Sequence, residues 1–304
     1  MDHPLILEEN SKLRRRVIQL ARSSYSVKRE GNIVFVCGGS GPTDMRTRFR
    51  DYCFKHHPDF EIFFAEFAMR NYFSNGHREQ FDLAAFEELV GELSHAIVLF
   101  PEAPGSYAET GYFSAVDKLA SNTILAMDAH WQGKDSFISM GPARKIGAVS
   151  RFDPVIQTPY KQPAFEDIAS RVLRFPFSKT MKQLAVDTFR ALSTYELFCL
   201  LHKCFSLLTI ATIDDILFLV NGIFSGQISK PKIKHITSVL VGANYLIEIG
   251  TYGHYRADKT KGDLLKLRTG CAHEEASILV ELATLYNSTD AEFQSLVEGA
   301  VNAA

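Results

Sequence analysis

The sequence predicts an α/β fold in which a parallel, Rossmann-like sheet is followed by a mostly helical module. Apolar runs with the length and composition of buried strands cover residues 32–37, 60–64, 96–100 and 122–127. Segments with helical periodicity separate these runs, which implies right-handed crossovers between parallel strands. The alternation ends near residue 175, where the composition changes.

Helical segments are expected in order along this first part. Residues 5–24 have the pattern of an amphipathic helix, and Gly31 breaks the helical pattern after it. Further helices are predicted over about 43–56 and 79–94. Residues 171–178, which contain Pro176, are typical of a junction. The predicted organisation is therefore an N-terminal helix (1–30), an α/β domain (31–175) and a C-terminal domain (176–304).

The C-terminal domain is predicted to contain three helices over about 180–207, 212–222 and 230–245. A β-like segment follows over 245–256, with a glycine-bounded turn at 250–253, and a last helix covers about 272–286. Three helices followed by a hairpin is the order of a winged helix-turn-helix domain.

Composition limits the classes of function. The 304 residues carry a net charge of −2, so any binding of nucleic acid must depend on a local patch. The five cysteines are scattered without a C-x-x-C pair, which is typical of a reducing cytoplasm. No signal peptide is apparent, and the most apolar stretch, 197–210, is too short to span a bilayer. A cytoplasmic protein without membrane association is expected.

The segment 97–113 carries the most chemical information. A buried strand ends at Pro101, the chain turns through Pro104, Gly105 and Ser106, and a helix is expected to begin there. Ser106 is the predicted N-cap, and Glu109 follows at the capping-box spacing. Since ligands of open α/β sheets bind beyond the carboxyl ends of the strands, Glu109 points to where a nucleotide would lie. The alternative interpretation is that Glu109 only caps the helix.

A second turn with potential for ligand binding follows the first predicted strand. Gly38 and Gly39 allow a ribose or base to approach the backbone closely, and Arg48 can contact a phosphate through two hydrogen bonds. The turn is not a Walker A loop, and Asp44 occupies the third glycine position of a G-x-G-x-x-G motif. A tight turn without ligand remains the alternative.

Two further carboxylates follow predicted strands. Glu66 comes after the second strand and is a candidate partner of Glu109, and Asp128 ends the fourth strand, where it can hydrogen-bond a ribose or a base. Cleavage of a ribosyl C1′–N bond passes through an oxocarbenium-like state that an anion stabilises or captures. A solvent-exposed loop residue is the alternative for Glu66. Histidines at metal-ligand spacing are absent from the sequence, so no metal site is predicted.

These motifs resemble those of the nucleoside deoxyribosyltransferase-like effectors of bacterial retrons. The resemblance rests on the Cys37-Gly38-Gly39 turn, Arg48, the turn before Glu109, and the run from Asp128 to Pro142; at Glu66 the family usually has Pro where this chain has Ala65. It implies that Glu109 is the catalytic carboxylate of an N-glycosidase.

The resemblance also implies a biological setting. The effectors of the family that this chain resembles are toxins that defend bacteria against phage. A reverse transcriptase bound to a branched RNA–DNA product (msDNA) holds these toxins inactive. The implied substrate is NAD or a related (deoxy)nucleotide, with no cofactor, and a higher-order oligomer with the retron complex is expected.

The C-terminal domain contains a candidate nucleic-acid surface. Residues 226–270 hold eight Lys or Arg and three acidic residues. The predicted phosphate contacts are Lys230, Lys232, Lys234, Arg256, Lys259 and Lys261. A solvated basic face is the alternative.

Two other functions stay open. The first domain could sense a nucleotide without catalysis and act through an associated toxin, or the protein could be a ligand-responsive transcription factor. Lysines favour contact with the nucleic-acid backbone over the reading of bases, which counts against sequence-specific regulation.

Overall fold

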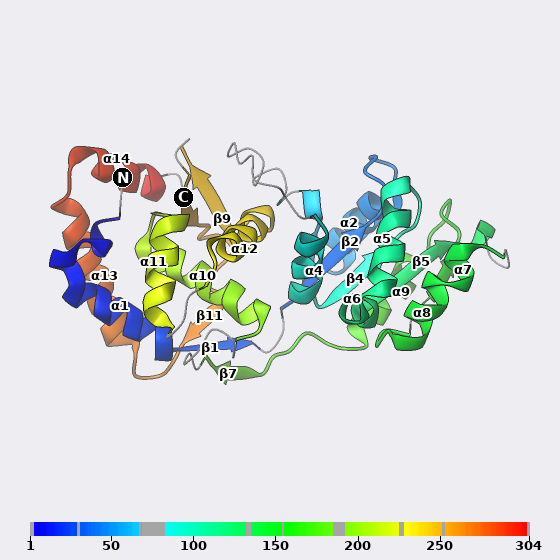
Figure 1. Ribbon diagram of the computed structural model, residues 1–304, viewed down its shortest axis with the longest axis horizontal. Helices are drawn as coiled ribbons and strands as arrows, with labels where there is room; N and C mark the ends of the chain where they lie inside the picture. Colours follow the sequence, from blue (N-terminus) through cyan, green and yellow to red (C-terminus); the bar gives the residue numbers. More distant parts are fainter. Residues whose placement is uncertain are drawn as a thin grey trace. The chain divides into compact units, whose positions relative to one another are not determined.

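The computed structural model describes residues 3–28, 31–66, 68, 83–131, 135–153, 155–184, 192–224, 228–250 and 253–302. The chain divides into two compact units (Figure 1). The α/β unit comprises Glu30–Ala65 and Gln80–Ser178. The helical unit comprises Met1–Arg29, Glu66–Glu79 and Lys179–Ala304, so the N-terminal residues belong with the C-terminal part of the chain.

A five-stranded parallel sheet forms the centre of the α/β unit. Its strands are β2 (Ile33–Cys37), β3 (Glu61–Phe63), β4 (Ala96–Leu99), β5 (Thr123–Asp128) and β6 (Val155–Thr158). Every residue of β2 and β4 is buried, as expected for strands covered on both faces. All neighbouring strands pair in parallel, which confirms the predicted parallel sheet.

The strand order is β3-β2-β4-β5-β6. The chain leaves β2 toward one edge of the sheet to form β3, then returns past β2 to form β4 on its other side. This reversal makes the β2–β4 boundary a topological switch point, where the loops after the two strands separate and ligands of doubly wound sheets bind.

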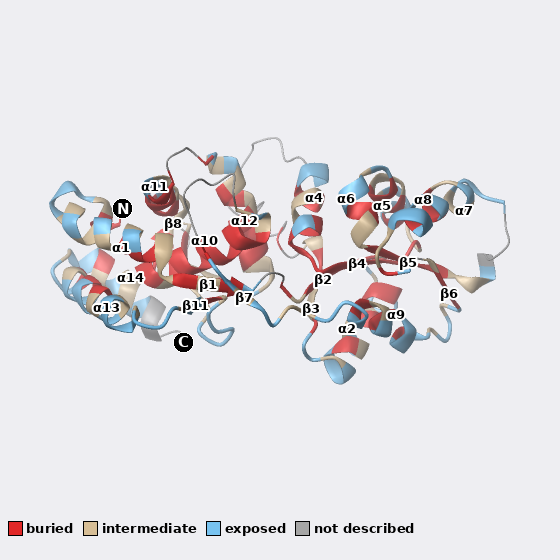
Figure 2. Cartoon of the chain, turned by 90° about the horizontal axis from the view of Figure 1, so that it is seen from below, coloured by how far each residue is buried: buried red, intermediate tan, exposed pale blue. Residues whose placement is uncertain are grey.

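Helices cover both faces of this sheet (Figure 2). One face carries α4 (Leu83–Leu93), α5 (Pro104–Ala115), α6 (Asp117–Asn122) and α8 (Pro142–Val149). The other face carries α2 (Met45–His56) and α9 (Phe165–Leu173), and the short α7 (Phe137–Met140) precedes α8. Aromatic contacts join the layers, since the rings of Phe49 on α2 and Phe100 after β4 lie 5.8 Å apart.

The helical unit contains the predicted three helices and hairpin. These are α10 (Thr194–Leu208), α11 (Ile213–Ile223), α12 (Lys230–Gly242) and the strands β9 (Leu246–Ile249) and β10 (His254–Ala257). The short strand β8 (Ala211–Thr212) pairs with β10, which completes an antiparallel sheet of order β8-β10-β9. Capping boxes explain two helix starts, Ser193 with Glu196 for α10 and Thr212 with Asp215 for α11.

A second antiparallel sheet in this unit was not predicted. Strand β1 (Tyr25–Lys28) pairs with β7 (Met181–Gln183) on one side and with β11 (Leu265–Leu267) on the other. The prediction of helix from residue 180 is therefore wrong, because β7 occupies its first turn. Strands of three or four residues give too short a period-2 pattern to be recognised, and these pair with partners distant in sequence.

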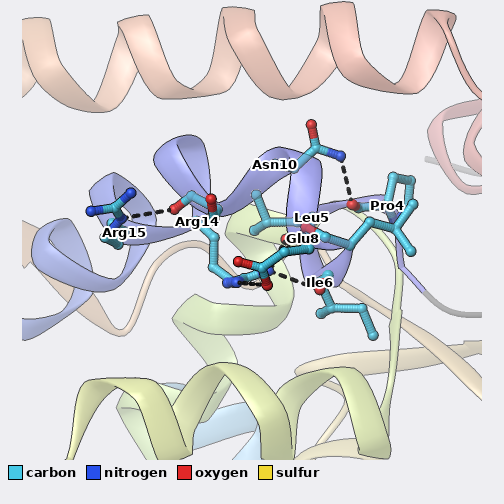
Figure 3. Close-up of polar contacts among 9 residues, drawn as sticks. Pro4, Leu5, Ile6, Glu8, Asn10, Arg14 and Arg15 are labelled. Carbon is cyan, nitrogen blue, oxygen red and sulfur yellow. Dashed lines mark hydrogen bonds and ion pairs between the residues drawn. The ribbon is translucent and has the colours of Figure 1, made fainter.

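The N-terminal segment folds as two short 3-10 turns, η1 (Pro4–Ile6) and η2 (Glu8–Asn10), before α1 (Ser11–Ser23) begins. The predicted helix over 5–24 thus starts later than expected. Arg14 on α1 donates to the carbonyls of Ile6 at 2.8 Å and Leu7 at 3.0 Å, and Asn10 donates to the carbonyl of Pro4 at 2.9 Å (Figure 3). These side chains bind the carbonyls that a continuous helix would have paired internally.

The last two described helices are α13 (Ala272–Asn287) and α14 (Ala291–Asn302). The sequence predicted α13 but not α14. Within the described ranges, no helix has both the length and the apolar character needed to cross a membrane.

Candidate functional site

The start of α5 decides how Glu109 is interpreted. The N-cap is Ala103 and Pro104 is the first helical residue, so Ser106 is the third residue of α5 and not its cap. The buried Ser106 hydroxyl accepts hydrogen bonds from the backbone amides of Glu102 and Ala103, both at 3.0 Å. Glu109 is consequently the sixth residue of the helix, beyond the first-turn amides that a cap can reach. The capping interpretation of Glu109 is wrong.

Glu109 lies beside the carboxyl end of β2. The buried thiol of Cys37, the last residue of that strand, is hydrogen-bonded to Glu109. Burial, followed by the Glu109 and Glu87 carboxylates, raises the pKa of Cys37 well above its ordinary value. The thiol is thus a neutral neighbour of Glu109 at physiological pH, not a nucleophile.

Glu87 is a second acidic neighbour of Glu109 that sequence reasoning missed. It lies on α4 with only 7% of its surface exposed. Burial and the charge of Glu109 together raise the pKa of Glu87 from 4.5 to about 8. The available signal was its position in α4, since Glu87 precedes the buried Val90 and Gly91 by three and four residues.

Glu102 joins the two loops at the switch point. Its Oε1 accepts hydrogen bonds from the backbone amides of Gly39 and Met45, each at 2.9 Å. Met45 is the first residue of α2, so Glu102 caps a helix from another part of the sequence. It takes the position at the helix N-terminus where an anionic ligand often binds. Sequence reasoning missed this residue, although it lies directly after a buried strand.

The carboxylates of Glu102 and Asp44 pack closely against Gly38 and Gly39, the glycines of the turn after β2. A Cβ atom on Gly38 would lie 2.9 Å from Oε1 of Glu102, and one on Gly39 would lie 2.3 Å from Oδ2 of Asp44. Asp44 Oδ2 also accepts a hydrogen bond from the Gly41 amide at 2.7 Å. The small size of both glycines is therefore required by the turn itself, whether or not a ligand binds.

The side chains of Asp128 and Arg48 both form hydrogen bonds with Tyr160, in the loop after β6. The Oδ1 of Asp128 accepts hydrogen bonds from the amides of His130 at 3.1 Å and Tyr160 at 3.4 Å. Arg48 on α2 donates to the carbonyl of Tyr160 at 2.6 Å. Both side chains order this loop at the carboxyl edge of the sheet, and their predicted contacts with substrate stay predictions.

Three other residues from the sequence-based prediction are Gly105, Ser106 and Glu66. Gly105 is exposed in the first turn of α5, with no atom within 4 Å of where a Cβ would be. The hydroxyl of Ser106 is occupied by the turn, which argues against its predicted contact with substrate. Glu66 belongs to the helical unit, and its pairing with Glu109 stays a prediction.

The predicted nucleic-acid contacts divide by exposure. Lys234 and Arg256 are buried, with 8% and 4% of their surfaces exposed, which corrects their placement on an exposed face. Lys230 pairs with Asp214 at 2.5 Å. Lys259 and Lys261 are exposed after β10, and Lys232 is half-buried on α12.

Among the residues that the structure describes, no group of three or more His, Cys, Asp or Glu side chains is arranged to hold a metal ion.

Comparison with known proteins gives two findings. Residues 42–248, more than half of the chain, match the family model of the STM3845 retron effector protein. The chain is also 33% identical over 115 residues to an Escherichia coli protein named retron Ec86 putative ribosyltransferase/DNA-binding protein, a match that covers 37% of this chain and 36% of that relative. The match therefore spans about a third of the relative's length. On the breadth of the family match, the chain belongs to the STM3845 family of retron effectors.

Proposed function

We propose that this effector cleaves the N-glycosidic bond of NAD or a related (deoxy)nucleotide, with Glu109 as the catalytic carboxylate. The observation that carries the proposal is the position of Glu109, in the second turn of α5 beside Cys37, where it has no capping role. The name of the Escherichia coli relative, putative ribosyltransferase, supports the same class of chemistry.

The chemistry requires one carboxylate near C1′ of the sugar. As the C1′–N bond breaks, its electron pair leaves with the base, and the ring becomes an oxocarbenium-like cation. The Glu109 carboxylate stabilises this cation or forms a bond to C1′, and water then adds at C1′ and loses a proton. Burial near the sheet strengthens the electrostatic effect of the carboxylate on the cation.

The experiment combines a substrate panel with one substitution. Purified protein is incubated with NAD and with the common (deoxy)nucleotides, and released base is measured by chromatography. We expect Glu109→Gln to abolish base release, since it keeps the shape of the side chain but removes its charge, while the melting temperature does not fall. Base release by Glu109→Gln at the parental rate would contradict the assignment.

Within a retron, we propose that the toxin is held inactive by the reverse transcriptase and its msDNA, through the basic part of the helical unit. The three helices and hairpin support a winged-helix assignment, and the Escherichia coli relative is also named a DNA-binding protein. Co-expression tests this: toxicity should appear when the effector is produced alone and disappear when the other retron components are present.

The naming of the relative as a DNA-binding protein also favours a second candidate, a nucleotide-sensing DNA-binding regulator without catalysis. It predicts that nucleotides bind without base release and change the affinity for duplex DNA. Calorimetry with each nucleotide, followed by a DNA-binding titration, separates it from the glycosidase.

A further inference from the structure

The start of α2 lies where doubly wound sheets commonly bind a phosphate. It follows the turn after β2, Gly38–Gly41, at the switch point of the sheet. The first amides of such a helix have no partner within the helix and favour an anion. In this chain the anion is a side chain. Glu102 Oε1 accepts from the amides of Gly39 and Met45 at 2.9 Å each, and its Oε2 accepts from the Met45 amide at 3.0 Å.

The backbone around Glu102 is fixed on both sides. Before it, the amide of Phe100 donates to the carbonyl of Cys37 at 3.0 Å, which joins the end of β4 to the end of β2. At Glu102 itself, the amide donates to the buried Ser106 hydroxyl at 3.0 Å. Because the short segment between β4 and α5 is held by these bonds, the Glu102 carboxylate reaches the start of α2 from a fixed position.

Carboxylates flank the glycine turn on two sides. A Cβ atom on Gly38 would lie 2.9 Å from Oε1 of Glu102, and one on Gly39 would lie 2.3 Å from Oδ2 of Asp44. Asp44 is the N-cap residue of α2, yet its side chain accepts from the Gly41 amide at 2.7 Å and does not cap the helix. The capping role is left to Glu102, and a phosphate entering the turn would meet both carboxylates.

We propose that Glu102 is a built-in anion that excludes phosphate from the glycine turn, so that a nucleotide presents its sugar, and not its phosphates, to this part of the site. This inference rests on the proposed function of Glu109, which lies in the second turn of α5, the helix that follows Glu102. A phosphate could bind the amides of Gly39 and Met45 only by displacing the carboxylate. Displacement would remove the hydrogen bonds of a half-buried charged group, which is costly.

The arginines at the start of α2 have contacts of their own. The guanidinium carbon of Arg46 lies 5.0 Å from the centre of the Phe64 ring. Arg48 donates to the carbonyl of Tyr160, in the loop after β6, at 2.6 Å. A phosphate bound by Arg48 would therefore lie toward that loop, so the predicted role of Arg48 agrees with the exclusion of phosphate from the glycine turn.

Inorganic phosphate tests the proposal without a nucleotide. In the parent, phosphate should leave the amide NMR resonances of Gly39 and Met45 unchanged. Glu102→Ala frees both amides, so phosphate should shift both resonances. Its affinity should be at least about tenfold higher than for the parent, the equivalent of one hydrogen bond to a charged group. Phosphate should also raise the melting temperature of Glu102→Ala more than sodium chloride of equal ionic strength does, because a ligand of the folded state stabilises it.

Two further variants separate the effect of the carboxylate from a loss of stability. Val36→Ala leaves a cavity in β2 but keeps Glu102, so it should be destabilised and should bind phosphate no better than the parent. Glu102→Gln keeps the volume of the side chain and removes its charge, so its phosphate affinity should lie between those of the parent and Glu102→Ala. Glu102→Gln also provides the test if Glu102→Ala does not fold.

The outcomes are separable. Phosphate-dependent shifts of the Gly39 and Met45 amides in the parent would overturn the proposal. So would a phosphate affinity of the Glu102 variants equal to that of the parent. If the parent releases no base from any nucleotide, the proposed function fails, while the phosphate titration still decides whether Glu102 closes the turn to anions.

Discussion

The Oε1 atom of Glu102 accepts a hydrogen bond from the backbone amide of Gly39 at 2.9 Å, across the switch point between β2 and β4. The same atom accepts from the first amide of α2, that of Met45, at 2.9 Å. One carboxylate thus holds the glycine turn, the start of a helix and the loop before α5 in register. Glu109 is placed relative to the turn by this arrangement.

Glu102→Ala should destabilise the protein by about 1–3 kcal/mol, because two partly buried amides lose their acceptor. Glu102→Gln should cost less, since its side-chain oxygen can still accept one of the hydrogen bonds. Urea unfolding measures both variants. If both variants keep the parental free energy of unfolding, the Glu102 carboxylate does not stabilise the turn.

Gly39→Ala should destabilise the turn by ~1 kcal/mol, since the new Cβ displaces Asp44 from its hydrogen bond with the Gly41 amide. Gly105→Ala is the matched control, because it meets no atom within 4 Å and adds a better helix former in α5. Thermal melting should rank Gly105→Ala above the parent and Gly39→Ala below it. The reverse ranking would contradict the close packing of Gly39.

Charge reversal at Lys232, Lys259 and Lys261 should weaken binding to an RNA–DNA ligand without affecting base release. These lysines are at least partly exposed, unlike Lys234, whose substitution would disturb the core. Each lost phosphate contact should reduce the salt slope of binding by about 0.7–0.9. Fluorescence anisotropy across a salt series measures this.

The control for that series is Lys55→Glu, an exposed charge reversal on α2 of the α/β unit. If the triple variant and this control bind the ligand equally well, the basic residues of the helical unit are not its contact surface.

Stability should fall as pH drops from about 6.5 to 4, because His3 is buried in its neutral form. Burial lowers the pKa of His3 from 6.5 to about 4, although Asp215, which accepts from the His3 amide at 3.0 Å, opposes the shift. The unfolded chain takes up a proton near pH 6.5 and the folded chain does not, so the stability present above pH 6.5 is lost on acidification. His202, with its pKa lowered to about 4 by burial, adds to the effect.

His3→Gln should therefore show a smaller loss of stability between pH 7 and 4.5 than the parent, measured by urea unfolding. His273→Gln, an exposed position on α13, is the control and should follow the parental curve. An unchanged pH dependence in His3→Gln would show that His3 is not the titrating group.

The sequence by itself determined four strands of the parallel sheet, because β2, β3, β4 and β5 lie in continuous apolar runs bounded by turns, and this signal is local; β6 (Val155–Thr158), which alternates buried and exposed residues, was not predicted. It also determined the position of Glu109 after β4 and the order of three helices and a hairpin. Only the tertiary structure decided the roles of the side chains around Glu109. Ser106 was predicted as the cap, but the helix starts earlier, Glu102 binds the distant Gly39 amide, and Glu87 on α4 is buried. The sheet of β1, β7 and β11 was missed for the same reason. Contacts between residues far apart in the chain leave no periodic trace in the sequence, and burial, which sets the charge of Glu87, arises only when the elements pack.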